Sequence, residues 1–264
     1  MKIFLSFIKE LQKSFSMWNF WFIYGNQDVK NKYTRSIIGP WWITIAIMVT
    51  VFAMGPLYAK ILNVGDGSNM GVYLMHLSTG LVFWFFISGT IAESTTAFIS
   101  HESIIKQTNS SFFVYIFRVV YRNLIALGHN LVLVFIFYPF YGSPSINVLW
   151  FIPSLLLVII LLICVSYVVA VISTRYRDII PLVASILQLS MFLTPVFWMP
   201  NLAAEKSKFL LFNPFNYILK ILRAPFYNDF YYWDYILVIL SSFIVFFMAF
   251  YFYMKYKKVL VYWI

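Results

Sequence analysis

Long apolar runs alternate with short charged segments along most of the chain. An α-helix rises about 1.5 Å per residue, so a helix needs roughly 20 residues to cross the apolar core of a bilayer. Six stretches of about this length are apolar enough, and we predict that each forms a membrane-spanning helix. The predicted spans are Ile38 to Tyr58, Tyr73 to Ala92, Asn123 to Tyr141, Leu149 to Ile172, Ile179 to Met199 and Tyr235 to Met254.

These spans predict an all-α integral membrane protein with a single transmembrane domain over residues 1–264. The six spans occupy 38–254, and residues 255–264 form a short tail. We find no segment outside the spans that is large enough to build a hydrophobic core of its own.

The first 24 residues follow a different pattern, because their apolar positions recur with a helical period. At about 100° per residue, one narrow face collects six large apolar side chains and the opposite face carries three lysines. The apolar set is Phe4, Ile8, Leu11, Phe15, Trp18 and Phe22, and the lysines are Lys2, Lys9 and Lys13. The stretch lacks the continuous apolar core and cleavage site of a signal peptide. Residues 1–36 are therefore expected to form an amphipathic interface helix and a linker, with the aromatic side chains in the lipid.

Composition agrees with a membrane protein, at 62% hydrophobic, 22% aromatic and 11% charged residues. Lys and Arg are retained on the cytoplasmic side of short loops. With six spans and both termini inside, that side holds fourteen Lys and Arg and the other side five. We therefore place both termini in the cytoplasm. The formal charge of +10 is spread over helix ends instead of one face, which argues against nucleic acid as a partner.

Common catalytic and metal-binding signatures are missing from the sequence. It has no G-x-x-x-x-G-K-[ST] phosphate loop, no H-E-x-x-H and no paired-cysteine spacing, and its single Cys164 lies within a predicted span. We predict no catalytic residue, no metal and no cofactor in this chain, so that any energy-driven work requires a nucleotide bound by another protein. His129 lies within a span beside Asn130 and is expected to hydrogen-bond a neighbouring helix.

Three segments carry more specific patterns. Residues 27–42 read Q-D-V-K-N-K-Y-T-R-S-I-I-G-P-W-W, a charged segment entering a helix through a proline and two interfacial tryptophans. Residues 173–179 read S-T-R-Y-R-D-I in the short loop between two spans, and the next span ends T-P-V-F-W at 194–198. Residues 209–223 combine an apolar run too short to span with N-P-F-N-Y-I-L-K-I-L-R, which predicts a re-entrant helical hairpin between spans five and six.

In this order and at these distances, the three segments resemble those of membrane permease subunits of ABC polysaccharide exporters, of the O-antigen, capsule or teichoic acid type. Gln27 stands where the family pattern has Arg. The resemblance implies a channel for lipid-linked polysaccharide, O antigen foremost, across the bacterial inner membrane. It also implies a second copy of the chain and two ATPase subunits that bind ATP and Mg. The residues that it points to are Arg35, Arg175, Arg177 and Asp178 in a cytoplasmic motif, and Asn213, Pro214, Tyr217 and Arg223 in a periplasmic gate.

The loop after the second span offers a short polar helix with two apolar residues. It resembles the coupling helix that docks in an ATPase groove, and its candidate residues are His101, Glu102, Ser103, Ile104, Ile105 and Lys106. The F-P step that usually follows is replaced by Ser111-Phe112-Phe113. From the residues alone, a simple connecting helix remains an alternative.

The many aromatic residues suit a glycan channel, because flat rings can stack on the C–H faces of sugars. Candidates are Trp41, Trp42, Phe83, Trp84, Phe85, Phe86, Phe192, Phe197 and Trp198. Aromatic residues at span ends are also ordinary membrane-interface residues.

Two other functions remain open at this point. The chain could be a membrane glycosyl- or acyltransferase that uses Glu93, His101, Glu102 or Asp178, although these groups show no catalytic spacing. It could also belong to an ABC exporter of a smaller lipid or drug.

Overall fold

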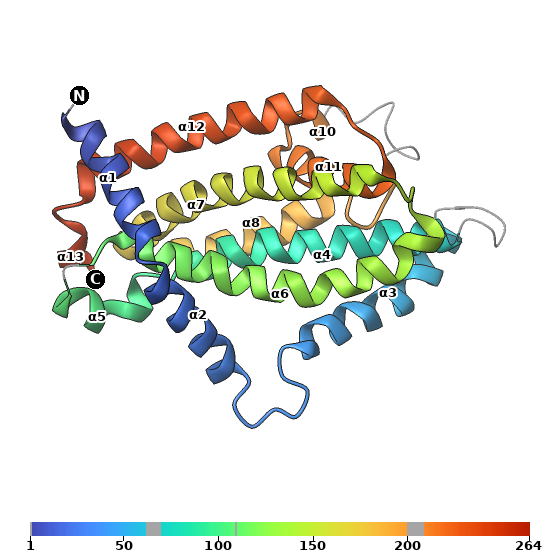
Figure 1. Cartoon of the computed structure of the whole chain (residues 1–264), viewed down its shortest axis with the longest axis horizontal. Helices are drawn as coiled ribbons and strands as arrows, with labels where there is room; N and C mark the ends of the chain where they lie inside the picture. The colour runs from blue at the N-terminus through green and yellow to red at the C-terminus, as the bar shows by residue number, and fades with distance from the viewer. Residues whose placement is uncertain (1, 62–69, 109, 200–208) are drawn as a thin grey trace.

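The computed structural model of the protein describes residues 2–61, 70–108, 110–199 and 209–264. Every regular element within these ranges is helical (Figure 1). Five helices are long and apolar enough to cross a membrane, which confirms the predicted all-α membrane fold. They are α3 (Trp41–Ile61), α4 (Met70–Ser94), α6 (Phe112–Tyr141), α7 (Phe151–Arg175) and α12 (Tyr232–Tyr256).

The helix at the position of the fifth predicted span is shorter than expected. Helix α8 runs over Ile179–Leu193, so its 15 residues are about 22 Å long, and the predicted end at Met199 is wrong. Pro195 explains the early stop, because a proline disfavours helical geometry in the residue before it. Thr194 is accordingly extended, with φ −96° and ψ 143°.

Helix α6 begins eleven residues before the predicted start of the third span at Asn123. Ser111 caps its first turn by accepting a hydrogen bond from the backbone N–H of Phe113. The prediction avoided Arg118 and Arg122 as membrane residues, but both are neutralised by carboxylates from other helices. The helix therefore begins ahead of the predicted span, in a segment whose two arginines are paired with carboxylates of α2 and α4.

The N-terminal segment forms two helices instead of the single helix expected over its first 24 residues. They are α1 (Lys2–Ser16) and α2 (Trp18–Lys32), which meet at Met17. Phe7, absent from the predicted apolar face, is buried and packs edge-on against Phe113 and Tyr253. Four aromatics of the predicted face, Phe4, Phe15, Trp18 and Phe22, are exposed and available to lipid. The segment is therefore anchored to the bundle through the Phe7 side of α1, with Ile8 and Leu11 packed beside Phe7, and it exposes aromatic side chains elsewhere.

Helix α4 lies at the centre of the larger of two hydrophobic cores. Its side chains from Tyr73 to Ile91 pack against α3, α6, α7, α8 and α11, and most of them are fully buried. The second core joins α1, α6, α7 and α12 near Phe113 and Tyr167, whose rings stack with centroids 4.3 Å apart. The two cores meet at Leu124, Ile159 and Val245, which pack against both, so the apolar interior runs along the bundle.

The short elements mark the two ends of the bundle (Figure 1). Helices α1, α5 (Glu102–Gln107) and α13 (Leu260–Trp263) lie at the end that carries both chain termini, which we call the terminal end. The 3₁₀ turn η1 (Ile99–His101) precedes α5 there. The opposite, distal end holds η2 (Ile146–Trp150), α10 (Phe209–Phe212) and α11 (Pro214–Tyr227). Helices α10 and α11 occupy the place of the predicted re-entrant hairpin, whose residues 200–208 lie outside the described ranges.

Candidate functional sites at the two ends of the bundle

Four charged side chains from three helices form a terminal ionic cluster, namely Asp28, Glu93, Arg118 and Arg122. Asp28 on α2 receives two hydrogen bonds from Arg118 on α6, at 2.7 Å from Nε and 2.5 Å from Nη2. Arg122, one turn further along α6, donates to Glu93 on α4 at 2.7 Å and lies 3.3 Å from Asp28. The cluster therefore ties the N-terminal segment to two long helices of the bundle.

Burial alone would raise the pKa of the Asp28 carboxyl, because a partly buried charge loses hydration. The hydrogen bonds and positive charge of Arg118, together with the charge of Arg122, instead hold that pKa below its ordinary value of 3.8. Asp28 is therefore ionised at neutral pH. Asp28 lies in the segment of residues 27–42, and its role there is to join the terminal ionic cluster, which was not predicted from the sequence. The signal was present, since Arg118 and Arg122 are four residues apart and so share one face of a helix.

Arg35, the residue expected to act in the same segment, stays outside the cluster. It is exposed and has φ 68°, the left-handed geometry that few residues other than glycine adopt. Gly39 also has a positive φ of 62°, and its N–H donates to Ser36 Oγ at 3.0 Å. These residues turn the chain sharply between α2 and α3, which begins at Trp41, directly after Pro40 and three residues later than the predicted start at Ile38.

The turn between α7 and α8 is as short as the sequence indicates. Arg175 lies with its guanidinium 4.8 Å from the ring centre of Trp263 on α13 and 5.2 Å from that of Tyr176. Neither Arg177 nor Asp178 forms an ion pair within the part of the chain that the structure describes. Arg–Asp pairing therefore does not hold this turn, and the Arg175–Trp263 contact joins it to the C-terminal segment instead.

The candidate coupling residues form α5 and the turn before it. Ile105 is buried in the second core, near Phe113 and Tyr167, and Ile104 packs against the same core. Ser103 is exposed. Lys106 donates to Glu102 at 2.6 Å on the outer face, and both side chains are nearly half exposed. That hydrogen bond lowers the pKa of the Glu102 carboxyl. His101 holds the start of the helix through Nδ1, 2.8 Å from the carbonyl of Ala97. Helix α5 is thus fixed by apolar contacts and presents a charged face.

Helix α1 is joined to α12 and to the start of α6 at the terminal end. Glu10 accepts hydrogen bonds from Lys257 at 2.5 Å and from the Tyr253 hydroxyl at 2.8 Å. Ser14 donates to Ser111, the capping residue of α6, at 2.6 Å. Burial would raise the pKa of Glu10, but Lys257 and Tyr253 keep it below its ordinary value. The N-terminal segment therefore connects α12 to the start of α6.

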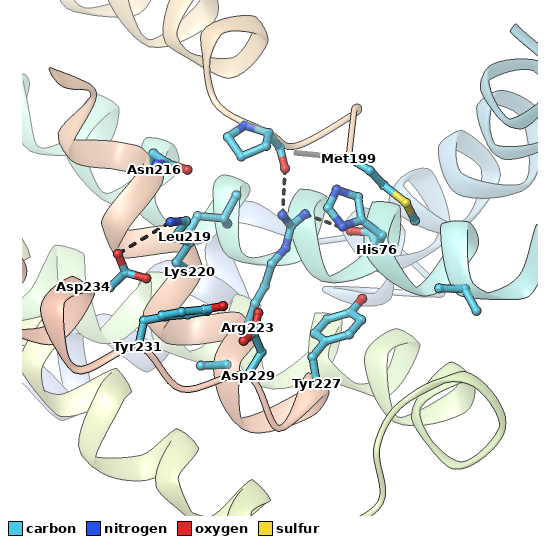
Figure 2. Close-up of a pocket in the computed structure, with 13 residues that line it drawn as sticks. His76, Met199, Asn216, Leu219, Lys220, Arg223, Tyr227, Asp229, Tyr231 and Asp234 are labelled. Atoms are coloured by element: carbon cyan, nitrogen blue, oxygen red, sulfur yellow. Dashed lines mark hydrogen bonds and ion pairs between the residues drawn. The ribbon is translucent and has the colours of Figure 1, made fainter. Parts of the chain in front are cut away.

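At the distal end, the Arg223 side chain joins three elements (Figure 2). From α11, it donates to the carbonyl of Pro195 at 2.7 Å and to that of His76 at 2.8 Å. Gly80, one turn from His76, is required by this approach, because a Cβ there would collide with Nη2 of Arg223 and the carbonyl of Val196. A buried arginine thus links α11, the break after α8 and the first half of α4.

The other predicted gate residues lie on the same helix. Asn213 caps α11 through Oδ1, which accepts from the Phe215 N–H at 3.0 Å, and its Nδ2 donates to Thr194 Oγ1 at 2.9 Å. Pro214 occupies the first helical turn, where its missing N–H costs nothing. Tyr217 donates to the Leu211 carbonyl at 2.9 Å. The predicted gate therefore forms one structural unit attached to the end of α8.

A pocket of about 440 Å³ opens beside Arg223, and we call it the distal pocket (Figure 2). It is bordered by α4, α11, the first turn of α12 and the segment after α8. Its lining side chains are Val72, His76, Pro195, Met199, Asn216, Leu219, Lys220, Arg223, Ala224, Tyr227, Asp229, Tyr231 and Asp234. Only Arg223 among them was identified from the sequence. His76 accompanies it, with Nε2 3.1 Å from the Trp198 carbonyl.

The predicted channel aromatics divide into buried and exposed groups. Phe83 and Trp84 are enclosed in the core, where Phe83 stacks on Phe151 and Trp84 meets Phe215 edge-on, and Phe86 is buried with them. These three cannot line a channel in this conformation, because the surrounding helices cover them. The exposed group consists of Trp41, Trp42, Phe85 and Phe192, with Phe197 stacked on Phe192 and Trp198 donating to the Phe192 carbonyl.

A second pocket of about 440 Å³ lies between α3, α4 and α6 and includes Trp42 and Phe85 in its wall. Near it, Thr44 on α3 donates to Asn130 on α6 at 2.8 Å. The contact between helices that was predicted for His129 is thus made by its neighbour, while His129 Nδ1 lies 2.8 Å from the Ile125 carbonyl of its own helix. Within the described ranges, no three His, Cys, Asp or Glu side chains are close enough to hold a metal ion.

Comparison with known proteins adds a family to this geometry. Residues 20–227 match the family model described as ABC-2 type transporter. The chain belongs to this family. Two curated proteins of Klebsiella pneumoniae, each named O-antigen export system permease protein RfbA, are 25% identical to it over 229 residues. The match covers 81% of this chain and 82% of each relative. Membership in the ABC-2 family makes the chain a multi-pass membrane subunit of an ABC exporter and implies an ATPase partner.

Proposed function

We propose that this ABC-2 permease forms the channel of an ATP-driven exporter of lipid-linked polysaccharide, O antigen foremost, across the bacterial inner membrane. The observation that carries the proposal is the family match over residues 20–227, joined by relatives whose printed name is that of an O-antigen export permease. The active assembly contains two copies of the chain and two ATPase subunits that bind ATP and Mg. Both termini face the cytoplasm, so the terminal end meets the ATPase.

The geometry of α5 supports its assignment as the coupling helix. It follows α4 directly through η1 and leads into α6, so a force on α5 reaches two long helices of the bundle. Ile105 anchors it from within, and Glu102 with Lys106 presents a pair of opposite charges to a partner. The link from Ser14 to Ser111 brings α1 into the same unit.

Helix α8 supports the pairing of two copies. Only Leu187 on this helix is buried, and Ser185 and Gln188 are exposed among apolar side chains. A glutamine amide is costly to leave facing lipid, so a surface with Gln188 in its middle favours contact with protein or with a water-filled channel. Exposed Phe192 on the same helix and Trp41 and Trp42 on α3 are then positioned to stack on passing sugar rings.

The structure argues against the alternative of a membrane transferase. Glu93 is saturated by Arg122 and by Asn123, whose Nδ2 donates to it at 2.7 Å. Glu102 is paired at the surface, and His101 is turned toward the Ala97 carbonyl. Three of the four candidate catalytic groups, all but Asp178, therefore have structural partners, and the four do not line a common pocket in the described part of the chain.

The proposal is tested by deleting the gene from its native strain. Surface polysaccharide should disappear and the lipid-linked polymer should accumulate inside, because synthesis continues without export. The wild-type chain should restore display, whereas the double variant Glu102→Lys/Lys106→Glu should fail although it keeps the pair within the helix. An immunoblot of the membranes controls for the amount of each chain. Unchanged surface polysaccharide in the deletion strain would reject glycan export, and full display by the charge-swapped variant would reject the coupling role of α5.

A further inference from the structure

We infer that the distal pocket binds a single neutral pyranose ring of the exported glycan. This inference rests on the proposed function and adds a saccharide site at the exit end of each chain. The pocket lies beside α11, which carries the predicted gate, and its volume of about 440 Å³ is in the range of small-molecule sites.

Two buried polar atoms in the pocket wall lack a partner. Asn216 is 2% exposed, and its Oδ1 accepts no hydrogen bond within the described residues, although its Nδ2 donates to the Leu210 carbonyl. Arg223 is 8% exposed, and its Nε donates none there. One atom is an acceptor and the other a donor, and buried polar groups are normally paired. A hydroxyl group can donate and accept at once, so hydroxyls of a ligand suit both atoms once the two side chains turn toward the pocket, from which both atoms are closed off in this conformation.

The charges of the pocket favour a neutral ligand. Two basic side chains, Lys220 and Arg223, face two carboxylates, Asp229 and Asp234, and Lys220 Nζ lies 3.5 Å from Asp234 Oδ1. A phosphate or carboxylate would be repelled by both aspartates, and a cation by both basic groups. Carboxylates, an amide and a guanidinium around one cavity are instead suited to a ring that carries several hydroxyl groups.

Two tyrosine rings supply the aromatic part of the wall. Tyr227 and Tyr231 border the pocket from the end of α11 and from the residue before α12 (Figure 2). Tyr231 is 60% exposed, so its ring has a free surface. A pyranose has flat C–H faces that stack on such rings, whereas an open-chain polyol has none. Ring shape should therefore matter as much as the number of hydroxyl groups.

The test uses the purified full chain in lipid nanodiscs and saturation-transfer NMR. The probes are free D-glucose, D-galactose, D-mannose and L-rhamnose, with sorbitol and inorganic phosphate as comparison compounds. We expect transfer to at least one ring sugar and none to sorbitol, and phosphate should not displace the sugar. Tyr231→Ala should weaken sugar binding about fivefold by removing a stacking face. Asp229→Asn should weaken it similarly, and the exposed Asp229 makes no ion pair in the described residues, so folding should be preserved.

Tyr232→Ala is the matched control, because Tyr232 is equally exposed and adjacent but does not line the pocket. It should bind sugar like the wild type. Absence of transfer to all four sugars, displacement by phosphate, or equal binding by the Tyr231→Ala, Asp229→Asn and control variants would each overturn the inference. If one of these results is found while the wild-type chain restores surface polysaccharide in the deletion strain, the proposed glycan export is retained and only the sugar-binding role of the distal pocket is rejected. If the wild-type chain has no effect on surface polysaccharide, the proposed function itself fails.

Discussion

Two buried arginines, Arg118 at 7% and Arg223 at 8% residue exposure, stabilise opposite ends of the molecule in different ways. Arg118 at the terminal end faces the carboxylate of Asp28, and its neighbour Arg122 bridges to Glu93. Arg223 at the distal end donates only to the carbonyls of Pro195 and His76. Each keeps one N–H group without a partner in the described residues. The difference is therefore a carboxylate bonded directly to the arginine, which Arg118 has and Arg223 lacks within the described residues.

This difference indicates a fixed end and an adaptable end. Removing one member of a buried ion pair strands the other charge, which strongly opposes any opening of the terminal ionic cluster. Hydrogen bonds to neutral carbonyls are weaker and can be exchanged for bonds to water or to a ligand. Helix α11 is thus held to its neighbours without a buried ion pair at Arg223, which is compatible with the gate role that the sequence predicts for it.

The largest effect should come from the terminal ionic cluster. Asp28→Ala leaves Arg118 buried without its carboxylate, and we expect the free energy of unfolding in mixed micelles to fall by about 3–5 kcal/mol. Asp229→Asn at the distal end is the matched control, because that carboxylate is exposed and makes no ion pair in the described residues. A change of under about 1 kcal/mol for Asp28→Ala would show that the cluster does not fix the terminal end.

A smaller loss is expected at the distal end. Arg223→Met removes two hydrogen bonds from a charged donor but strands no opposite charge, so about 2 kcal/mol should be lost. Gly80→Ala should have a similar effect, because its Cβ displaces the guanidinium. The double variant should be little worse than either single one, since both remove the same contact.

Gly128→Ala provides the control for the glycine substitution. A Cβ at Gly128 on α6 meets no atom within 4 Å, so alanine should be neutral or slightly stabilising. Equal destabilisation by Gly80→Ala and Gly128→Ala, or full additivity of Gly80→Ala with Arg223→Met, would contradict the account of the Arg223 contact.

Acid should weaken the terminal end selectively. The folded-state pKa values of Asp28 and Glu10 lie below their ordinary values of 3.8 and 4.5. Their contribution is therefore complete above those values and is lost as the pH falls through the folded-state pKa. Unfolding measured from pH 6 down to pH 3 should show this loss, and Asp28→Asn should make the curve flatter. Identical acid dependence in the wild type and Asp28→Asn would exclude Asp28 as a source.

The smallest stability effect is expected at α5. The pair between Glu102 and Lys106 is exposed, and such pairs contribute little to folding. Exchanging the two residues should leave the melting temperature unchanged while abolishing polysaccharide display. A melting temperature that falls in step with display would attribute the lost export to misfolding instead of lost docking.

Much of this fold could be predicted from hydropathy, because each of the five long helices contains a long run of apolar residues. The end of α8 is set by Pro195, which breaks the helix through its effect on the backbone of Thr194. Hydropathy does not register this break, because the apolar run continues past it. The pairing of Arg118 and Arg122 on α6 depended on carboxylates from distant parts of the chain, which no local pattern contains. Phe83 and Trp84 were predicted to line the channel but are buried, because sequence does not show which face of an apolar helix meets its neighbours.

The candidate sites were predictable to different degrees for the same reason. The α5 residues are consecutive and amphipathic, so the sequence located them together. The distal pocket joins His76, Asn216 and Asp234 from three separate elements, and only the folded chain brings them together.

The most direct test of the central claim is the composition of the native assembly. The tagged chain would be solubilised gently from its own membrane, and the mass and identity of the co-purifying proteins would be measured. We expect a complex of two permease chains and two phosphate-loop ATPase subunits, which the Glu102→Lys/Lys106→Glu variant loses. Reproducible recovery of a stable, monodisperse wild-type chain without any ATPase would contradict the assignment as the channel of an ATP-driven exporter.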